Sequence, residues 1–138
     1  MFFIVVSGSG DMAPFGIYIH WPFCETKCPY CDFNSHVREN INQDTWCRAY
    51  QAELKRYATE TGDRTVTSIF FGGGTPSLMA PETICALNTT INHYWPTSTD
   101  LEVTMEANPS TSELDKFRSY RAAGINRISI GVQSLNDA

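Results

Sequence analysis

Hydrophobic and polar positions alternate in four short runs of the chain, which predicts four β-strands. Between the runs lie three stretches whose apolar residues recur every three or four positions, as they do in amphipathic helices. The expected strands are Gly16–Trp21, Val66–Phe71, Leu101–Glu106 and Arg127–Val132. Strands and helices that alternate in this order predict an α/β fold, with a parallel sheet and right-handed crossovers.

The sequence also indicates where the helices begin and end. Asp44 is the expected N-cap of the first helix. Pro81 suits the first turn of the second helix, because proline needs no hydrogen-bond partner for its nitrogen there. In the third helix Ser110 and Glu113 fit a capping box, and Gly124 fits the position after the helix ends.

The polar parity of three of these strands predicts a polar surface on one side of the sheet. Right-handed crossovers place the three helices on the other side, against the apolar parity. Strands that are covered on both faces usually consist of continuous apolar runs, and these do not. The polar positions are Tyr18, His20, Glu102, Thr104, Glu106, Ser129, Gly131 and Gln133. A barrel lumen that receives a polar ligand and a sheet with one solvated face both satisfy this pattern.

The end of the chain resembles the start of another helix. Ser134 fits an N-cap directly after the fourth strand, and a parallel sheet that ended there would leave its edge strand unpaired. We therefore expect the chain to be the N-terminal part of a parallel (β/α) barrel, with about half of the barrel missing. With 138 residues, it is long enough for one domain with a hydrophobic core.

Composition narrows the class of protein. The net charge is −5 and the ten basic residues are scattered, so we expect no nucleic-acid partner. The apolar N-terminal run is shorter than the roughly 7–15 residues of a signal peptide's apolar region. No run approaches the ~20 apolar residues of a membrane span, so we expect a cytoplasmic protein with no transmembrane segment. Five cysteines and no secretion signal argue against a disulfide scaffold.

Three cysteines are close enough in the sequence to bind one inorganic centre. Cys24, Cys28 and Cys31 have the spacing C-x3-C-x2-C, which lets three thiolates converge from a single loop. Together with His36 they would complete a tetrahedral Cys3His zinc site. A [4Fe–4S] cluster would take the three thiolates and leave one iron open to a substrate. The spacing favours the iron–sulfur cluster, and zinc remains an alternative.

Other candidate ligand-binding residues follow the expected strands. Three glycines from residue 72 to 74 come directly after the second strand, where backbone N–H groups could bind an anionic group. A tight turn is the alternative explanation, although it needs only one glycine. Glu106 and Gln133 lie at the carboxyl ends of their strands. Because parallel strands end at the same edge, where α/β folds bind ligands, we expect one site there.

Together these motifs resemble those of radical S-adenosylmethionine (SAM) proteins of the oxygen-independent coproporphyrinogen III oxidase group. The segments that carry the resemblance are YIHWPFCETKCPYCDFNS, FFGGGTPSLM, EANP and GINRISIGVQSLND. Within this group the chain is most similar to the heme chaperone branch, HemW. The resemblance implies that residues 16–138 form a truncated radical SAM core domain, part of a (β/α) partial barrel. Residues 1–15 would be a loosely ordered extension.

The resemblance implies a site for two cofactors. Cys24, Cys28 and Cys31 would ligate three irons of a [4Fe–4S] cluster, and the fourth iron would chelate SAM. The positions that contact this SAM are matched by Tyr18, Gly73 and Glu106. The positions that line a second SAM site in the oxidase are matched by Tyr30, Gly74, Thr75 and Gln133. The family's chemistry is reductive cleavage of SAM, which starts radical reactions.

A single position favours one branch of the group. The oxidase carries a further cysteine two residues after the third cluster cysteine, where this chain has Phe33. The resemblance therefore favours a heme chaperone, which binds heme and transfers it to hemoproteins. An oxygen-independent coproporphyrinogen III dehydrogenase, a zinc-binding module and an inactive fragment are the alternatives. The implied partners are heme or a porphyrin, an electron donor and a recipient hemoprotein; no catalytic residue is assigned.

Overall fold

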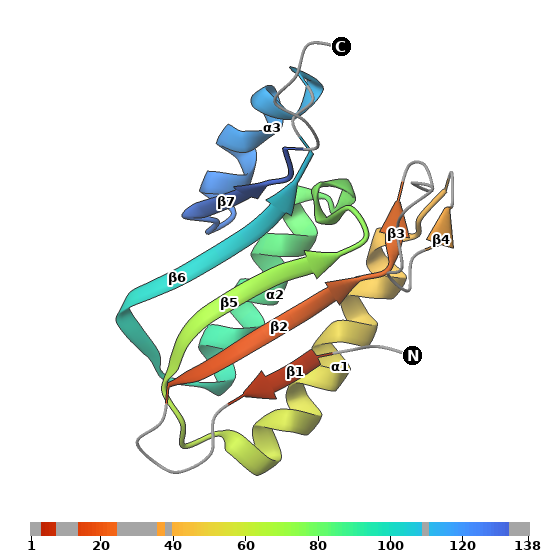
Figure 1. Cartoon of the computed structure of the whole chain (residues 1–138). Coiled ribbons are helices and arrows are strands. Elements are labelled where there is room, and N and C mark those ends of the chain that lie inside the picture. Colours follow the sequence, from red (N-terminus) through yellow and green to blue (C-terminus); the bar gives the residue numbers. More distant parts are fainter. Residues whose placement is uncertain (1–3, 8–13, 25–35, 38–39, 109–110, 133–138) are drawn as a thin grey trace.

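The computed structural model describes residues 4–7, 14–24, 36–37, 40–108 and 111–132. Its main element is a five-stranded sheet with the strand order β1-β2-β5-β6-β7 (Figure 1). The strands are β1 (Ile4–Ser7), β2 (Phe15–Trp21), β5 (Val66–Gly73), β6 (Thr97–Ala107) and β7 (Arg127–Ile130). Strands β2, β5, β6 and β7 are parallel, which confirms the α/β fold class expected from the alternating pattern.

Strands β2, β5 and β6 are each followed along the chain by a helix that returns to the start of the next parallel strand. The helices are α1 (Gln43–Thr61), α2 (Pro81–Tyr94) and α3 (Thr111–Ala122). Helices α1 and α2 lie behind the sheet in the view of Figure 1. Buried residues of all three helices join the apolar parity of β2, β5 and β6 in one core, which includes Ile17, Tyr50, Leu87, Met105 and Tyr120. The helices therefore pack on the apolar parity, as the crossover rule predicts.

Residues 1–15 contain one element that we did not expect. Strand β1 pairs antiparallel with β2, with Ile4 opposite Ile19 and Ser7 opposite Gly16. The expectation of a loosely ordered extension therefore does not describe Ile4–Ser7. This pairing covers one edge of the parallel sheet and supplies hydrogen-bond partners for β2.

The carboxyl end of β5 also differs from the expected boundary. The strand extends to Gly73, whereas the apolar run ends at Phe71. Gly72 pairs with His20 and Gly73 pairs with Trp21 of β2, so two of the three glycines belong to the sheet. A short 3-10 helix, η1 (Pro76–Leu78), then leads into α2.

The helix termini are partly as the sequence predicts. Asn42, and not Asp44, caps α1, since its side-chain oxygen accepts a hydrogen bond from the Thr45 N–H at 3.0 Å. Asp44 lies in the first turn, where its negative charge favours the positive end of the helix dipole. Pro81 begins α2 as expected. Gly124 follows α3 with a φ of +110°, as expected for a residue after a helix end.

Two short elements lie beside the carboxyl end of β2. Strands β3 (Phe23–Cys24) and β4 (His36–Val37) form a two-stranded parallel sheet, in which Cys24 pairs with Val37. The expected capping box of Ser110 and Glu113 involves side chains outside the described ones. Among the helices that the structure describes, none is long and apolar enough to cross a membrane.

Candidate functional site

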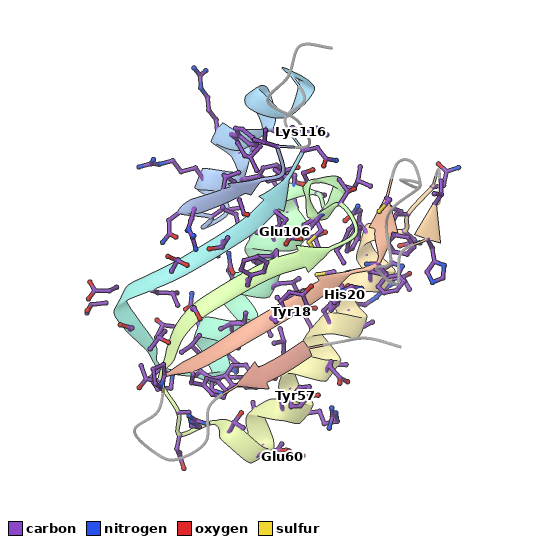
Figure 2. The ribbon with its side chains drawn as sticks, viewed as in Figure 1. Tyr18, His20, Tyr57, Glu60, Glu106 and Lys116 are labelled. Carbon is purple, nitrogen blue, oxygen red and sulfur yellow. The ribbon has the colours of Figure 1, made fainter. Side chains whose placement is uncertain are left out.

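Among the described residues, several that were expected to bind cofactors lie on β2, β5 and β6, toward the carboxyl ends of these strands. Figure 2 shows Tyr18 and His20 on β2 and Glu106 on β6, on the side of the sheet away from α1 and α2. Gly73 ends β5, which lies between these two strands. The polar parity therefore brings side chains from distant parts of the sequence to one edge of the sheet.

Glu106 is bound to the end of β5. The Gly73 N–H donates a hydrogen bond to Oε2 of Glu106 at 3.1 Å. Gly73 has a φ of +116°, a backbone conformation that residues with a Cβ rarely adopt. The positive φ favours glycine at position 73, the residue whose N–H holds the Glu106 carboxylate.

Tyr18 and His20 form the β2 side of the site. Tyr18 Oη and His20 Nδ1 are 3.4 Å apart and share a hydrogen bond, and the Tyr18 ring stacks on Phe70 at 5.8 Å. Burial raises the pKa of the Tyr18 phenol, and the negative charge of Glu106 raises it further. The Tyr18 hydroxyl is therefore neutral at physiological pH, and it lies close enough to Glu106 for an electrostatic interaction.

The glycines make close packing of the protein's own groups possible. A Cβ at Gly72 would lie 2.7 Å from the Tyr18 ring, and one at Gly73 would lie 2.7 Å from the His20 ring. A Cβ at Gly74 would lie 2.9 Å from Sγ of Cys24. Each of these distances is shorter than a real Cβ contact, so all three positions exclude larger residues.

The N–H groups of this segment are hydrogen-bonded to protein acceptors. Gly74 donates to the carbonyl of Trp21 and Thr75 donates to the carbonyl of Phe23, both at 2.7 Å. The sequence suggested that these N–H groups could bind an anionic group of a ligand. In the structure they already have acceptors within the protein. The one carboxylate that the Gly73 N–H binds is the protein's own, that of Glu106.

One of the three cluster cysteines lies within the described residues. Cys24 is in β3, has a free thiol and is 8% exposed. Cys28, Cys31 and two residues matched to the second SAM site, Tyr30 and Gln133, lie outside the described residues, as does Phe33.

The alternative zinc ligand His36 is exposed on β4. Its backbone N–H donates a hydrogen bond to the Pro22 carbonyl at 2.6 Å. Within the described part of the chain, no three metal-binding side chains converge. That part holds only one of the three clustered cysteines. The argument for iron over zinc therefore rests on the type and spacing of the ligands in the sequence.

The sequence did not identify the residues that hold the site from behind. Tyr50 of α1 donates its hydroxyl to the His20 carbonyl at 2.5 Å. Burial raises the pKa of Tyr50, so this hydroxyl remains a donor. Tyr120 of α3 donates to the Ser77 carbonyl at 2.5 Å, just after the glycines. The available signal was tyrosine at a buried helix position, where phenylalanine would satisfy the apolar pattern equally well.

Comparison with known families decides the class of protein. The model of the radical SAM superfamily matches residues 18–138. The chain belongs to the radical SAM superfamily. This membership implies a [4Fe–4S] cluster and SAM as cofactors.

The relatives of this radical SAM chain include heme chaperones. It is 44% identical over 131 residues to the heme chaperone HemW of Haemophilus influenzae, an alignment that covers 91% of the chain and 34% of the relative. HemW of Escherichia coli is 43% identical, with the same two coverages. A mitochondrial radical SAM domain-containing protein 1 of Bos taurus is 40% identical over 88% of the chain and 27% of its own length. The chain thus spans about a third of the length of these relatives.

A solved radical SAM enzyme has the same fold. The structure of coproporphyrinogen III oxidase (HemN) from Escherichia coli matches with a TM-score of 0.77 and 32% sequence identity. The match covers 86% of this chain and 28% of that one. The expected (β/α) radical SAM fold is therefore confirmed for the part that the two chains share.

The described residues fit the cofactors of the superfamily. Thiolates are the ligands that iron–sulfur clusters use, and the Cys24 thiol lies at the carboxyl end of the sheet beside Gly74. Glu106 and Tyr18 offer a carboxylate and a hydroxyl near this edge, groups that suit the polar amino acid part of SAM.

Proposed function

We propose that the chain is the cluster- and SAM-binding part of a heme chaperone. The observation that carries this proposal is Phe33, which replaces the additional cysteine of the oxidase in a chain 43–44% identical to two HemW proteins. Binding of heme and its transfer to hemoproteins would then be the role of the whole protein. Cluster and SAM would control that transfer.

In this proposal Cys24, Cys28 and Cys31 hold three irons of the [4Fe–4S] cluster. When bound, the cluster supplies a low-potential electron, which an external donor must provide. Tyr18, Gly73 and Glu106 bind the SAM at that cluster. Tyr30, Gly74, Thr75 and Gln133, which match positions that line a second SAM site in the oxidase, would line such a site here.

The chain's own residues would hold SAM in place through hydrogen bonds. The Glu106 carboxylate is fixed by the Gly73 N–H at 3.1 Å, so its second oxygen can accept a hydrogen bond from the SAM amino group. The Tyr18 hydroxyl, kept neutral by its raised pKa, can donate to the SAM carboxylate. These assignments give each charged group of the amino acid part a complementary partner.

A porphyrin-modifying enzyme is the second candidate. It is favoured by the match to coproporphyrinogen III oxidase at a TM-score of 0.77. As an oxygen-independent coproporphyrinogen III dehydrogenase, the protein would start decarboxylation of propionate side chains with the same cluster and SAM. Phe33 argues against this candidate, because the oxidase has a cysteine at that position.

Anaerobic assays of the reconstituted protein separate the two candidates. Heme is titrated into the protein and followed by its visible spectrum, and then an apo-hemoprotein is added as acceptor. In parallel, coproporphyrinogen III is incubated with the protein, SAM and a reductant. Heme binding and transfer without decarboxylation supports the chaperone, whereas conversion of coproporphyrinogen overturns it.

The location and the partners are part of the same proposal. The three described cysteines are free thiols, which suits a reducing compartment such as the cytoplasm. The partners would be heme or a porphyrin, an electron donor and a recipient hemoprotein.

A further inference from the structure

The segment that joins β5 to α2 connects the candidate site with two helices. It runs from Gly73 through η1 to Ala80, and its backbone groups bond to β2, β3, α1 and α3. A connection of this kind is usually a surface loop with few fixed contacts. Here Gly73, Thr75, Pro76, Ser77 and Met79 are buried.

On one side this segment packs on the first cluster cysteine. The N–H groups of Gly74 and Thr75 bond to the carbonyls of Trp21 and Phe23, the residues just before Cys24. A Cβ at Gly74 would lie 2.5 Å from the Phe23 carbonyl oxygen and 2.9 Å from the Cys24 sulfur, so only glycine lets the segment pack this closely on β3. The backbone of Gly74 therefore forms one wall of the space around the Cys24 thiol.

On the other side Tyr120 of α3 holds the same segment. Its hydroxyl donates to the Ser77 carbonyl at 2.5 Å and lies 3.5 Å from the Met79 carbonyl. Tyr120 is 1% exposed and Ser77 is 2% exposed, so the carbonyl has no access to water that could replace the phenol. A phenylalanine would fill nearly the same space but could not donate this hydrogen bond, so the hydroxyl is one link between α3 and the segment.

Gln43 of α1 adds a second support. Its Nε2 donates to the Leu78 carbonyl at 3.0 Å, and its Oε1 accepts from the Ala80 N–H at 3.2 Å. Oε1 also accepts from the Thr83 hydroxyl at the start of α2. The turn after the glycines is thus fixed from two helices at once.

We infer that Tyr120, assisted by Gln43, is a positioning residue for the cluster ligand Cys24. It acts through the η1 turn and Gly74, which confine the thiol before any iron is bound. The inference rests on the proposed role of Cys24 as an iron ligand. It also gives Gly74 and Thr75 a role besides the lining of a second SAM site, because they transmit the position of the turn to β3.

The test compares thiol protection in the cofactor-free chain. Tyr120→Phe should raise the rate at which iodoacetamide alkylates Cys24 at least about threefold, since one buried hydrogen bond to the turn is lost. Hydrogen exchange in the peptide that covers residues 73–80 should accelerate in the same variant. Both readouts come from mass spectrometry of the same samples.

The matched control is Trp95→Phe. Trp95 is buried, and its indole N–H donates to the Thr61 carbonyl at 3.0 Å at the opposite end of the sheet. This variant also loses a buried donor, so it reports the alkylation that general destabilisation causes. The inference is overturned if Tyr120→Phe alkylates no faster than Trp95→Phe.

Two further measurements keep the inference separate from the proposed function. If Tyr120→Phe does not fold, Gln43→Ala replaces it. An unchanged Cys24 alkylation rate in that variant then overturns the inferred positioning of Cys24. After anaerobic reconstitution, Tyr120→Phe should change the EPR spectrum of the reduced cluster, and Trp95→Phe should leave it unchanged. A parent chain that takes up no iron contradicts the proposed function, while the alkylation comparison still decides the role of Tyr120.

Discussion

Gly73 contacts three parts of the site: the Glu106 carboxylate, the His20 ring and the end of β2. It has a φ of +116°, its N–H donates to Glu106, and a Cβ here would lie 2.7 Å from the His20 ring. It also pairs with Trp21 at the end of β2. A side chain at this position would disturb β2, β5 and the carboxylate together.

Gly73→Ala and Gly124→Ala form a matched pair that separates stability from the site. Both glycines have a positive φ, and a Cβ at Gly124 would lie 2.8 Å from Nδ2 of Asn88. Each variant should lower the free energy of unfolding by about 1–3 kcal/mol, measured by urea denaturation. Only Gly73→Ala should also weaken SAM binding to the reconstituted chain, measured by calorimetry; equal SAM affinity in the two variants would contradict the site.

The residues of the site were largely accessible from the sequence, whereas their hydrogen-bond partners were not. Strand parity marks Tyr18 and Glu106, the glycine segment marks Gly73, and the motif resemblance implies that all three contact SAM. The structure brings Gly73 and Glu106 into direct contact. The sequence shows that the glycine segment has N–H donors. It does not show that the carbonyls of Trp21 and Phe23 accept hydrogen bonds from these N–H groups. Those bonds depend on the path of the chain from β2 into β3, which has no periodic pattern.

At the scale of whole elements, long periodic segments were predicted and short ones were not. The apolar parity and the helical stripes gave the order of the four parallel strands and three helices. Strands β3 and β4 have two residues each, too few for any period to be visible. Strand β1 lies before a glycine-rich stretch, and its antiparallel pairing with β2 depends on tertiary contacts alone.

The Asn126 side chain, just before β7, makes hydrogen bonds to backbone groups of β6 in the way that a neighbouring strand would. Its Oδ1 accepts from the Val103 N–H at 2.8 Å, and its Nδ2 donates to the Leu101 carbonyl at 2.7 Å. Asn126→Ala should destabilise the chain by about 1–3 kcal/mol, because these β6 groups lose their partners. Amide exchange in β7 should accelerate accordingly.

The control for this prediction is Asn92→Ala, an exposed position on α2. It should change the free energy of unfolding by less than about 0.5 kcal/mol. Equal denaturation midpoints for the two variants would mean that Asn126 does not hold β7 to β6.

At the scale of the whole molecule, we propose that the carboxyl edge of the parallel sheet carries the chemistry. The chain belongs to the radical SAM superfamily and shares its fold with coproporphyrinogen III oxidase. Gly73 contacts Glu106 at this edge, and Gly74 lies beside Cys24 there. The chain covers 34% of two HemW proteins, so heme transfer belongs to the proposal for the whole protein. The central claim for this chain is a thiolate-bound iron–sulfur cluster.

The measurement that tests this claim most directly is metal content after anaerobic reconstitution with iron and sulfide. The parent chain should bind about four irons and gain a broad visible absorbance. Cys24→Ser should lose both, whereas Cys85→Ser, an exposed thiol on α2, should keep both. One zinc without colour, or equal iron in Cys24→Ser and the parent, would contradict the account.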